Sequence, residues 1–402
     1  MAIFGGADIL LPKSEDYSKW AVIACDQFTS QPEYWEEVRR EVGDAPSTLH
    51  MILPEVLLPG TDEQLNAIHQ TMADYLSAGV FAEYKDSYIY VERTLLDGSI
   101  RKGLVGALDL DKYDYHPDTA VPVRATEATV QERIPPRMRV RRGAPLEMPH
   151  VLLLCDDQKK SIIEPLIGEK DKMEKVYDFD LCAGGGKIRG WLLGSAQTAM
   201  VNEAIAAYEQ EKMPLTYAVG DGNHSLATAK ACYEELKKNN PDADMSNHPA
   251  RFALVELENI HDEAQQFAPI HRLIAHTQPG HLLAYLAQHC TGEASCSIPW
   301  FSGNEQGVFQ LEMNPGQLPL AALQQALDGY LAENPGEIDY IHGDEALQKL
   351  AGQKDSIGFL VPGIEKGQFF QGIVTDGILP RKTFSMGHAV EKRYYLEARK
   401  IL

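Results

Sequence analysis

The feature that most restricts the fold of this 402-residue chain is an apolar segment that leads, within a few residues, into helix-forming sequence. Leu215 to Val219 has the length and composition of a buried strand. Gly220-Asp221-Gly222-Asn223-His224-Ser225 follows as a turn, and residues 226–230 favour a helix that begins at Ser225. A strand that passes so abruptly into a helix requires a layered structure in which helices cover a sheet.

The other segments predict a mixed α/β (α+β) fold, with mixed sheets and covering helices. Thr61-Asp62-Glu63-Gln64 has the form of a capping box, and apolar residues continue after it at helical spacing. Residues 88–95 and 99–108 flank Asp97-Gly98, a dipeptide that favours an antiparallel hairpin. Residues 151–155 form a continuous apolar run, typical of a strand covered on both faces.

Further elements follow along the chain. Helices are expected near 198–208, 281–289, 318–332 and 391–402, and strands near 307–313, 357–361 and 369–374. We predict three regions, which are 1–150 with the hairpin, 151–275 with the strand and turn described above, and 276–402.

Composition narrows the range of partners. The 58 acidic and 37 basic residues give a formal charge of -21, which excludes nucleic acid as the bulk partner, so an anionic ligand needs a local basic pocket. The six cysteines form no C-x-x-C pair and are expected to be reduced. The sequence shows no signal-peptide pattern and no membrane span, which predicts a soluble, cytoplasmic protein.

The turn at 220–225 has the chemistry of an anion site. Gly222 permits close approach of a ligand, and the N–H groups that open a helix carry partial positive charge. Asn223 or Ser225 would cap the helix, and His224 would act as a hydrogen-bond donor or base. Asp221 would hold Mg²⁺ or orient a hydroxyl. Ordinary turn and cap chemistry explains the same residues without a ligand, so both interpretations stay open.

Three other groups of residues favour structural interpretations. Three arginines between 137 and 141 alternate as on one face of a strand, and with Arg142 we predict a solvated face paired with acidic side chains. Gly184-Gly185-Gly186-Lys187 lacks the spacing of a phosphate loop and predicts a hairpin turn before a strand at 191–193. The histidines at 261 and 289 lack metal-ligand spacing, so no structural metal is assigned.

The turn resembles the Asp-Gly-His-His-Arg signature of a large bacterial and archaeal family, domain of unknown function 1015. Asn223 stands where the signature has its first His, and Ser225 stands where it has Arg, which removes a phosphate ligand. Other segments resemble the family's layout in the same order, at 21–26 with 46–50, 126–133, 267–272 and 379–383. Thr126 departs from the family, which has a histidine there. The residues that the resemblance carries over from these segments are Asp26, Glu127, Thr129, Arg133, His271, Arg272, Arg381, Lys382 and Thr383.

The same strand, turn and helix are distantly similar to the nucleotide-phosphate site of the ParB, sulfiredoxin and free-serine-kinase superfamily. This similarity implies a nucleotide- or phosphate-dependent enzyme that acts on a small, anionic or phosphorylated molecule, with kinase-like phosphoryl transfer favoured. Mg²⁺ and a nucleotide are the expected cofactors, with Asp221 and Glu127 as candidate Mg²⁺ ligands. The expected catalytic residues are Glu127, Asp221, His224 and Asp26.

Gly222, Asn223 and Ser225 are expected to bind the anion together with the hydroxylic and basic residues carried over. Glu127, His224, His271 and Lys382 are then expected to converge on one cleft. One alternative is a metal-assisted hydrolase, in which a divalent cation lies among Asp221, His224, Glu127 and His271. The other is a non-catalytic ligand-binding or sensor protein.

Overall fold

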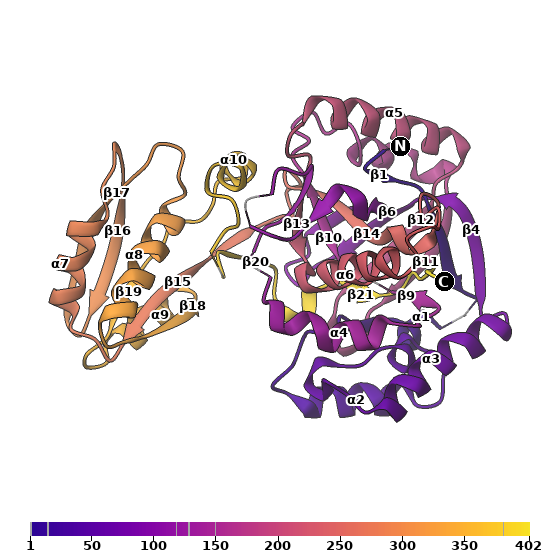
Figure 1. Ribbon diagram of the computed structural model, residues 1–402, viewed down its shortest axis with the longest axis horizontal. Helices are drawn as coiled ribbons and strands as arrows, with labels where there is room; N and C mark the ends of the chain where they lie inside the picture. The colour runs from indigo at the N-terminus through magenta and orange to yellow at the C-terminus, as the bar shows by residue number, and fades with distance from the viewer. Residues whose placement is uncertain (1, 14–15, 118, 128, 149, 381) are drawn as a thin grey trace. The chain divides into compact units, whose positions relative to one another are not determined.

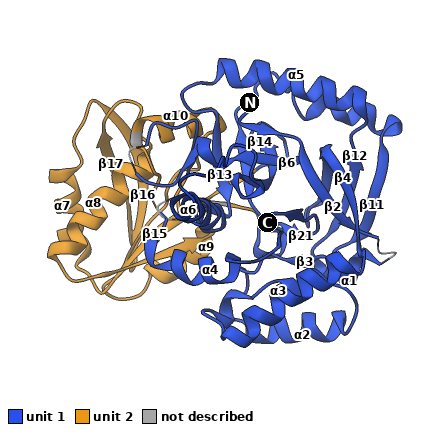
Figure 2. Cartoon of the chain, turned by 45° about the vertical axis from the view of Figure 1, so that its right-hand side comes forward, with its two compact units in different colours: residues 1–125, 129–265, 388–402 blue, residues 126–128, 266–387 orange. Residues whose placement is uncertain are grey.

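The computed structural model describes residues 2–13, 16–117, 119–127, 129–148, 150–380 and 382–402. The chain divides into two compact units (Figure 2). Unit 1 contains residues 1–125, 129–265 and 388–402, and unit 2 contains 126–128 and 266–387. The predicted regions 1–150, 151–275 and 276–402 do not coincide with these units, because one sheet of unit 1 takes strands from both sides of residue 150.

Unit 1 is built on a mixed sheet that has ten strands among the described residues (Figure 1). Their order is β11-β12-β5-β6-β14-β10-β13-β8-β7, and β1 pairs with β6. The central β10 runs parallel to β14 and antiparallel to β13. The bounds are β1 (Phe4–Gly5), β5 (Ile89–Thr94), β6 (Ile100–Asp109), β7 (Tyr113–Asp114), β8 (Val123–Ala125), β10 (Leu152–Cys155), β11 (Glu174–Asp180), β12 (Lys187–Leu192), β13 (Tyr217–Asp221) and β14 (Phe252–Asn259).

Helices and small sheets cover the two faces of this sheet. Alternation along β5 sends Ile89 and Val91 into one core and Tyr90 into the other. The Tyr90 core is closed by α5 (Ser195–Glu211) and α6 (Asn223–Asn239). The other core is covered by three helices, α1 (Tyr17–Trp20), α2 (Pro32–Val42) and α3 (Asp62–Ser77). Three two-stranded sheets also cover it: β2 (Ala7–Pro12) with β4 (Phe81–Ser87), β3 (Val22–Ile23) with β21 (Tyr394–Tyr395), and β9 (Leu146–Glu147) with β22 (Arg399–Lys400).

Unit 2 is built on a second, antiparallel sheet in the order β17-β16-β19-β15-β18, and β20 pairs with β15. Leu282 and Leu286 from one helix and Leu323 and Leu327 from another pack on Ile298 of the sheet. The bounds are β15 (Phe267–Ala275), α7 (Pro279–His289), β16 (Ala294–Ser302), β17 (Glu305–Met313), α8 (Pro319–Glu333), β18 (Glu337–His342), α9 (Asp344–Ala351), β19 (Ile357–Phe359), α10 (Lys366–Asp376) and β20 (Phe384–Met386).

Many predicted elements are confirmed. The capping box is formed, since Thr61 Oγ1 accepts the Gln64 N–H at 3.2 Å and the Gln64 side chain accepts the Thr61 N–H at 2.9 Å. The hairpin around Asp97-Gly98 joins β5 to β6, and the glycine turn joins β11 to β12. No described helix is long and apolar enough to cross a membrane.

Two element predictions were wrong. Residues 369–374 lie in α10 rather than in a strand, because Phe369, Phe370 and Ile373 form one buried face at helical spacing. Glu391 only ends a short 3-10 helix (Ala389–Glu391), and residues 392–402 form no helix. They are extended and carry β21 and β22, and 393–399 are buried throughout, a pattern that a one-sided surface helix does not show.

The arginine stretch was also assigned to the wrong element. Residues 137–141 belong to helix α4 (Ile134–Arg141), whose first turn contains two prolines, as suits the start of a helix. The expected pairing with acidic side chains is confirmed. Arg137 pairs with Glu55, Arg139 with Asp62, Arg141 with Glu147 and Arg142 with Glu235.

Candidate functional site

The turn between β13 and α6 is fixed by Gly222. Its φ is 80°, and a Cβ placed on it would lie 3.0 Å from Val151 Cα and 3.4 Å from His150 Cδ2. Glycine tolerates both the positive φ and this close approach. The helix begins at Asn223, two residues earlier than predicted. The turn therefore packs directly against residues 150–151, a contact that the sequence pattern did not reveal.

Asp221 ends β13 and connects the turn to the C-terminal segment. Its Oδ1 accepts the Gly222 N–H at 3.0 Å, and its Oδ2 lies 3.2 Å from Lys392 Nζ. The side chains of Asp221 and Lys392 are 19% and 15% exposed, so this ion pair is largely screened from water but still accessible. The N-cap Gly222 has no side chain with which to cap α6. The positive end of the helix and the Lys392 ammonium thus lie on either side of Asp221.

A second ion pair lies next to the turn. Asp26 Oδ2 is 3.3 Å from Nε2 of His150, and His150 is buried. The other ring nitrogen, Nδ1, lies 2.9 Å from the Tyr395 hydroxyl, which donates to Cys25 Sγ at 3.1 Å. Because the Tyr395 hydroxyl has one proton and donates it to Cys25, its oxygen accepts the hydrogen bond from His150 Nδ1. Asp26, His150, Tyr395 and Cys25 therefore form one continuous chain of polar contacts.

Asp26, His150, Asp221 and Lys392 form a charge cluster. Burial disfavours the charged ring of His150, but attraction to Asp26 and Asp221 outweighs it and raises the pKa of His150. Burial likewise opposes ionisation of Asp26, yet His150, Gln27 and Lys392 together lower the pKa of Asp26. The cluster thus combines two carboxylates with Lys392 and a His150 ring whose protonated form the carboxylates favour.

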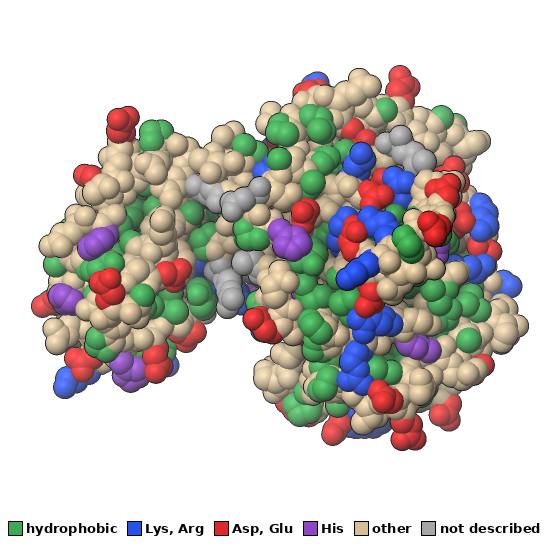
Figure 3. All heavy atoms as spheres, in the orientation of Figure 1, with side chains coloured by type: hydrophobic (Ala, Val, Ile, Leu, Met, Phe, Trp, Pro, Cys, Tyr) green, Lys and Arg blue, Asp and Glu red, His purple; other side chains and the backbone are tan. Residues whose placement is uncertain are grey.

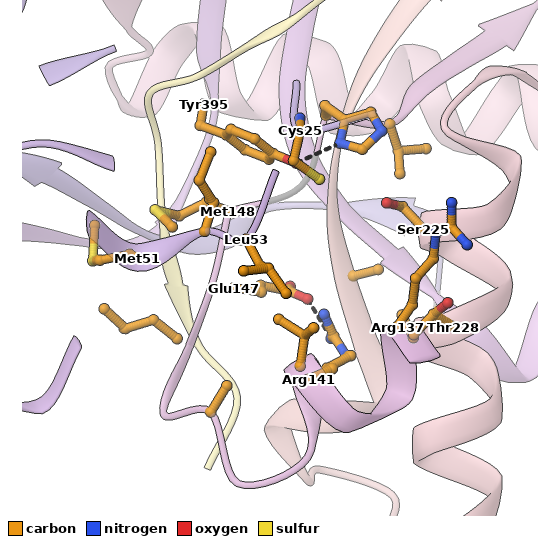
Figure 4. Close-up of a pocket in the computed structure, with 18 of the residues that line it drawn as sticks. Cys25, Met51, Leu53, Arg137, Arg141, Glu147, Met148, Ser225, Thr228 and Tyr395 are labelled. Carbon is orange, nitrogen blue, oxygen red and sulfur yellow. Dashed lines mark hydrogen bonds and ion pairs between the residues drawn. The ribbon is translucent and has the colours of Figure 1, made fainter. Parts of the chain in front are cut away.

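A pocket lies beside the cluster (Figure 4). It encloses about 900 Å³ of empty space, including open solvent at its mouth. Cys25, His150 and Tyr395 line it together with Ser225 from the first turn of α6. Basic side chains, interspersed with acidic ones, gather on the face of unit 1 over α4 and α6 (Figure 3).

Three further predicted residues lie in unit 1. The Val130 N–H donates to His224 Nε2 at 3.2 Å, so this nitrogen is an acceptor and ties the segment after residue 129 to α6. The Thr129 hydroxyl is enclosed and has no hydrogen-bond partner among the described residues. Arg133 is exposed, and its carbonyl accepts from Arg137.

The remaining predicted residues lie in unit 2. His271 is buried, where its Nε2 lies 3.0 Å from Asp344 Oδ1 and its Nδ1 accepts the Val361 N–H. Burial lowers the pKa of His271 despite Asp344. Arg272, on the opposite face of β15, donates to Gln324 at 2.6 Å and to the Lys382 carbonyl at 3.1 Å.

Burial lowers the pKa of Arg272 to about 10, although it is attracted to Glu127. Glu127 is bridged to Leu379 through the backbone, so Glu127, Arg272 and the segment near Lys382 gather within unit 2. Thr383 donates to the Pro380 carbonyl. Arg381 lies outside the described residues. The convergence of Glu127, His224, His271 and Lys382 on one cleft stays a prediction.

Sequence reasoning missed His150, Lys392 and Tyr395. His150 directly precedes the apolar run at 151–155, and a lone histidine there gave no motif. Lys392 and Tyr395 lie in the segment that was predicted as a helix, which hid their pairing with β3 and with Asp221. Among the described residues, no group of three His, Cys, Asp or Glu side chains is arranged to hold a metal ion.

Solved structures that are weakly similar to this chain include free serine kinase in complex with AMP, at 11% identity and a TM-score of 0.38, covering 73% of this chain and 91% of that chain. SbnI with a C-terminal truncation, from Staphylococcus aureus, is 9% identical with a TM-score of 0.35, covering 70% and 83%. A conserved hypothetical protein from Pyrococcus furiosus is 13% identical with a TM-score of 0.33, covering 72% and 90%.

A search of curated protein sequences finds no match. The sequence model of the family described as protein of unknown function, DUF1015, matches residues 7–395. This match spans nearly the whole chain, including the turn at Asp221 and the C-terminal segment that carries Lys392. The chain therefore belongs to the DUF1015 family.

Proposed function

We propose that this protein is a nucleotide- or phosphate-dependent enzyme that acts on a small molecule, with kinase-like phosphoryl transfer as its reaction. The observation that carries the proposal is the Lys392–Asp221 pair at the N-terminal end of α6. Helix N-termini favour phosphate oxygens, and a neighbouring ammonium adds a full positive charge. Lys392 thereby replaces the charge that is lost where Ser225 stands in place of the signature arginine.

The charge cluster also fits the chemistry of phosphoryl transfer, in which an enzyme mainly positions the reactants and neutralises developing charge. His150 adds a second cation behind the turn when it is protonated, and Asp26 holds its ring in place. When Mg²⁺ is bound, it would neutralise the phosphates, and the Asp221 carboxylate would supply an oxygen ligand. Glu127, the base expected from the sequence, lies in unit 2.

The test is calorimetric titration of the full-length protein with ATP, with and without Mg²⁺. Lys392→Met keeps the aliphatic stem and removes the ammonium, so we expect ATP to bind at least about tenfold more weakly. Lys170→Met is the matched control, because Lys170 is also partly buried and pairs with a carboxylate, Glu92, at 2.7 Å. The control variant is expected to bind ATP as the wild type does. Equal ATP affinity of the Lys392 variant and the wild type would refute the proposal.

A further inference from the structure

The pocket beside the charge cluster has an apolar interior. Its wall includes Met51 at the end of a short 3-10 helix (Thr48–Met51), Leu53, Met72 from α3, Met148 and Leu226 from α6. A concave, mostly apolar lining with a few polar groups is typical of small-molecule sites. Methionines on the wall adapt to the shape of a bound molecule.

Each charged side chain on the pocket wall is paired with a group of opposite charge, and His150 of the wall is paired with Asp26. Arg137 pairs with Glu55, and Arg141 lies 2.5 Å from Glu147, as Figure 4 shows for the second pair. Glu147 also forms an ion pair with Arg399, whose Nε lies 2.9 Å from Glu147 Oε1. A charged ligand body would have to be desolvated here without a free counter-charge, which is costly. The wall therefore selects a neutral body.

The polar end of the pocket adjoins the proposed phosphate site. Ser225 lines the pocket and belongs to the first turn of α6, and the turn at Gly222 packs on His150, which also lines it. In Figure 4, Ser225, Cys25 and Tyr395 lie on one side of the pocket and Arg141 lies on the opposite side. A molecule with its polar end at Ser225 would extend its body toward Met51 and Leu53.

We infer that this pocket binds the second, non-nucleotide ligand of the site, a small neutral molecule with an apolar body and one polar end group. The inference rests on the proposed function, and it names the class of ligand on which that function acts. Pairing of the charges on the wall disfavours a strongly charged ligand.

The test uses prodan, a neutral naphthalene with a ketone at one end and a dimethylamino group at the other, whose fluorescence reports binding in an apolar site. Ala229 lies on α6, is buried and lines the pocket. Ala229→Leu fills the pocket and is expected to weaken prodan binding at least about tenfold while ATP binding stays as in the wild type. Ala229→Met, whose side chain is unbranched, repeats the test if the leucine variant does not fold.

Ala204→Leu is the matched control. Ala204 lies on α5 and lines a different pocket of unit 1, so this variant is expected to bind prodan normally. Prodan binding that survives filling at Ala229, or that is lost at Ala204 instead, overturns the inference. Displacement of prodan by ATP also overturns it, because the pocket would then hold the nucleotide. Prodan binding without ATP binding supports the pocket and refutes the proposed function alone.

Discussion

At the scale of single residues, the pair formed by Asp26 and His150 makes the site sensitive to pH. The pKa of His150 is raised in the folded protein, so the stability that the pair contributes is complete below the ordinary pKa of histidine and is lost as pH rises through the raised value. The lowered pKa of Asp26 means that its contribution is lost only when pH falls through that value. The pair is therefore strongest at mildly acidic pH.

We expect His150→Gln to lower the free energy of unfolding by roughly 1–3 kcal/mol at about pH 6, since the partly buried Asp26 carboxylate loses its charged partner. The difference from the wild type should shrink as pH rises through the raised pKa. Urea denaturation of both proteins at a series of pH values measures it. A difference that stays constant at every pH would show that the His150 ring is neutral in the fold.

Asp221 permits a sharper test of its two interpretations. Asp221→Asn keeps the shape and the turn propensity but removes the charge. We expect the variant to bind inorganic phosphate without Mg²⁺ at least as well as the wild type, because Lys392 loses its competing partner. Its binding of ATP should no longer be strengthened by Mg²⁺. Calorimetric titrations under both conditions measure this, and an unchanged Mg²⁺ effect would remove Asp221 as a metal ligand.

The sequence predicted one half of each ion pair in the charge cluster. Asp26 and Asp221 were assigned through the family segments, whereas His150 and Lys392 were not. Each missed cation lies more than a hundred residues from its carboxylate along the chain. The pattern of residues along one helix or strand indicates which side chains share a face of that element. It contains no information about two residues from distant segments that come together only when the sheet is folded.

At the scale of elements, prediction succeeded where local chemistry decides the outcome. The capping box at Thr61 and the Asp97-Gly98 hairpin formed as expected, because the hydrogen bonds of each are made within a few residues. The segment 391–402 failed for the opposite reason. Arg393 and Glu397 have helical i,i+4 spacing and do form an ion pair at 2.6 Å, but extended pairing of the segment with β3 and β9 prevails.

The turn before α6 gives a prediction at this scale. Gly222→Ala places a methyl group at positive φ and 3.0 Å from Val151 Cα, so we expect a loss of about 1–3 kcal/mol in the free energy of unfolding. Gly280→Ala is the control, because Gly280 lies in the first turn of α7 with nothing within 4 Å of its Cβ position. The control should be neutral or slightly stabilising. Thermal or urea unfolding of both variants compares them, and similar losses would argue against a strained turn.

At the scale of the whole molecule, the chain leaves unit 1, builds unit 2 and returns to unit 1 with residues 388–402. The returning segment is held by buried charges. Arg393 lies 2.5 Å from Glu256 of β14 and 2.6 Å from Glu397, and all three side chains are at most 5% exposed. The same segment carries Lys392 and Tyr395 into the candidate site. The segment that completes the fold of unit 1 therefore also completes the candidate site.

Arg393→Met tests that coupling. It leaves Glu256 and Glu397 buried without their shared cation, which should cost about 3–5 kcal/mol. Hydrogen exchange read by mass spectrometry should then show faster exchange in β6 and β14 of unit 1, and unchanged exchange in β16 and β17 of unit 2. Lys400→Met, in the same segment but with an exposed partner in Glu83, should change exchange little. Equal acceleration in both units would mean that the two units unfold as one, because the loss of a contact confined to unit 1 would then be felt throughout the chain.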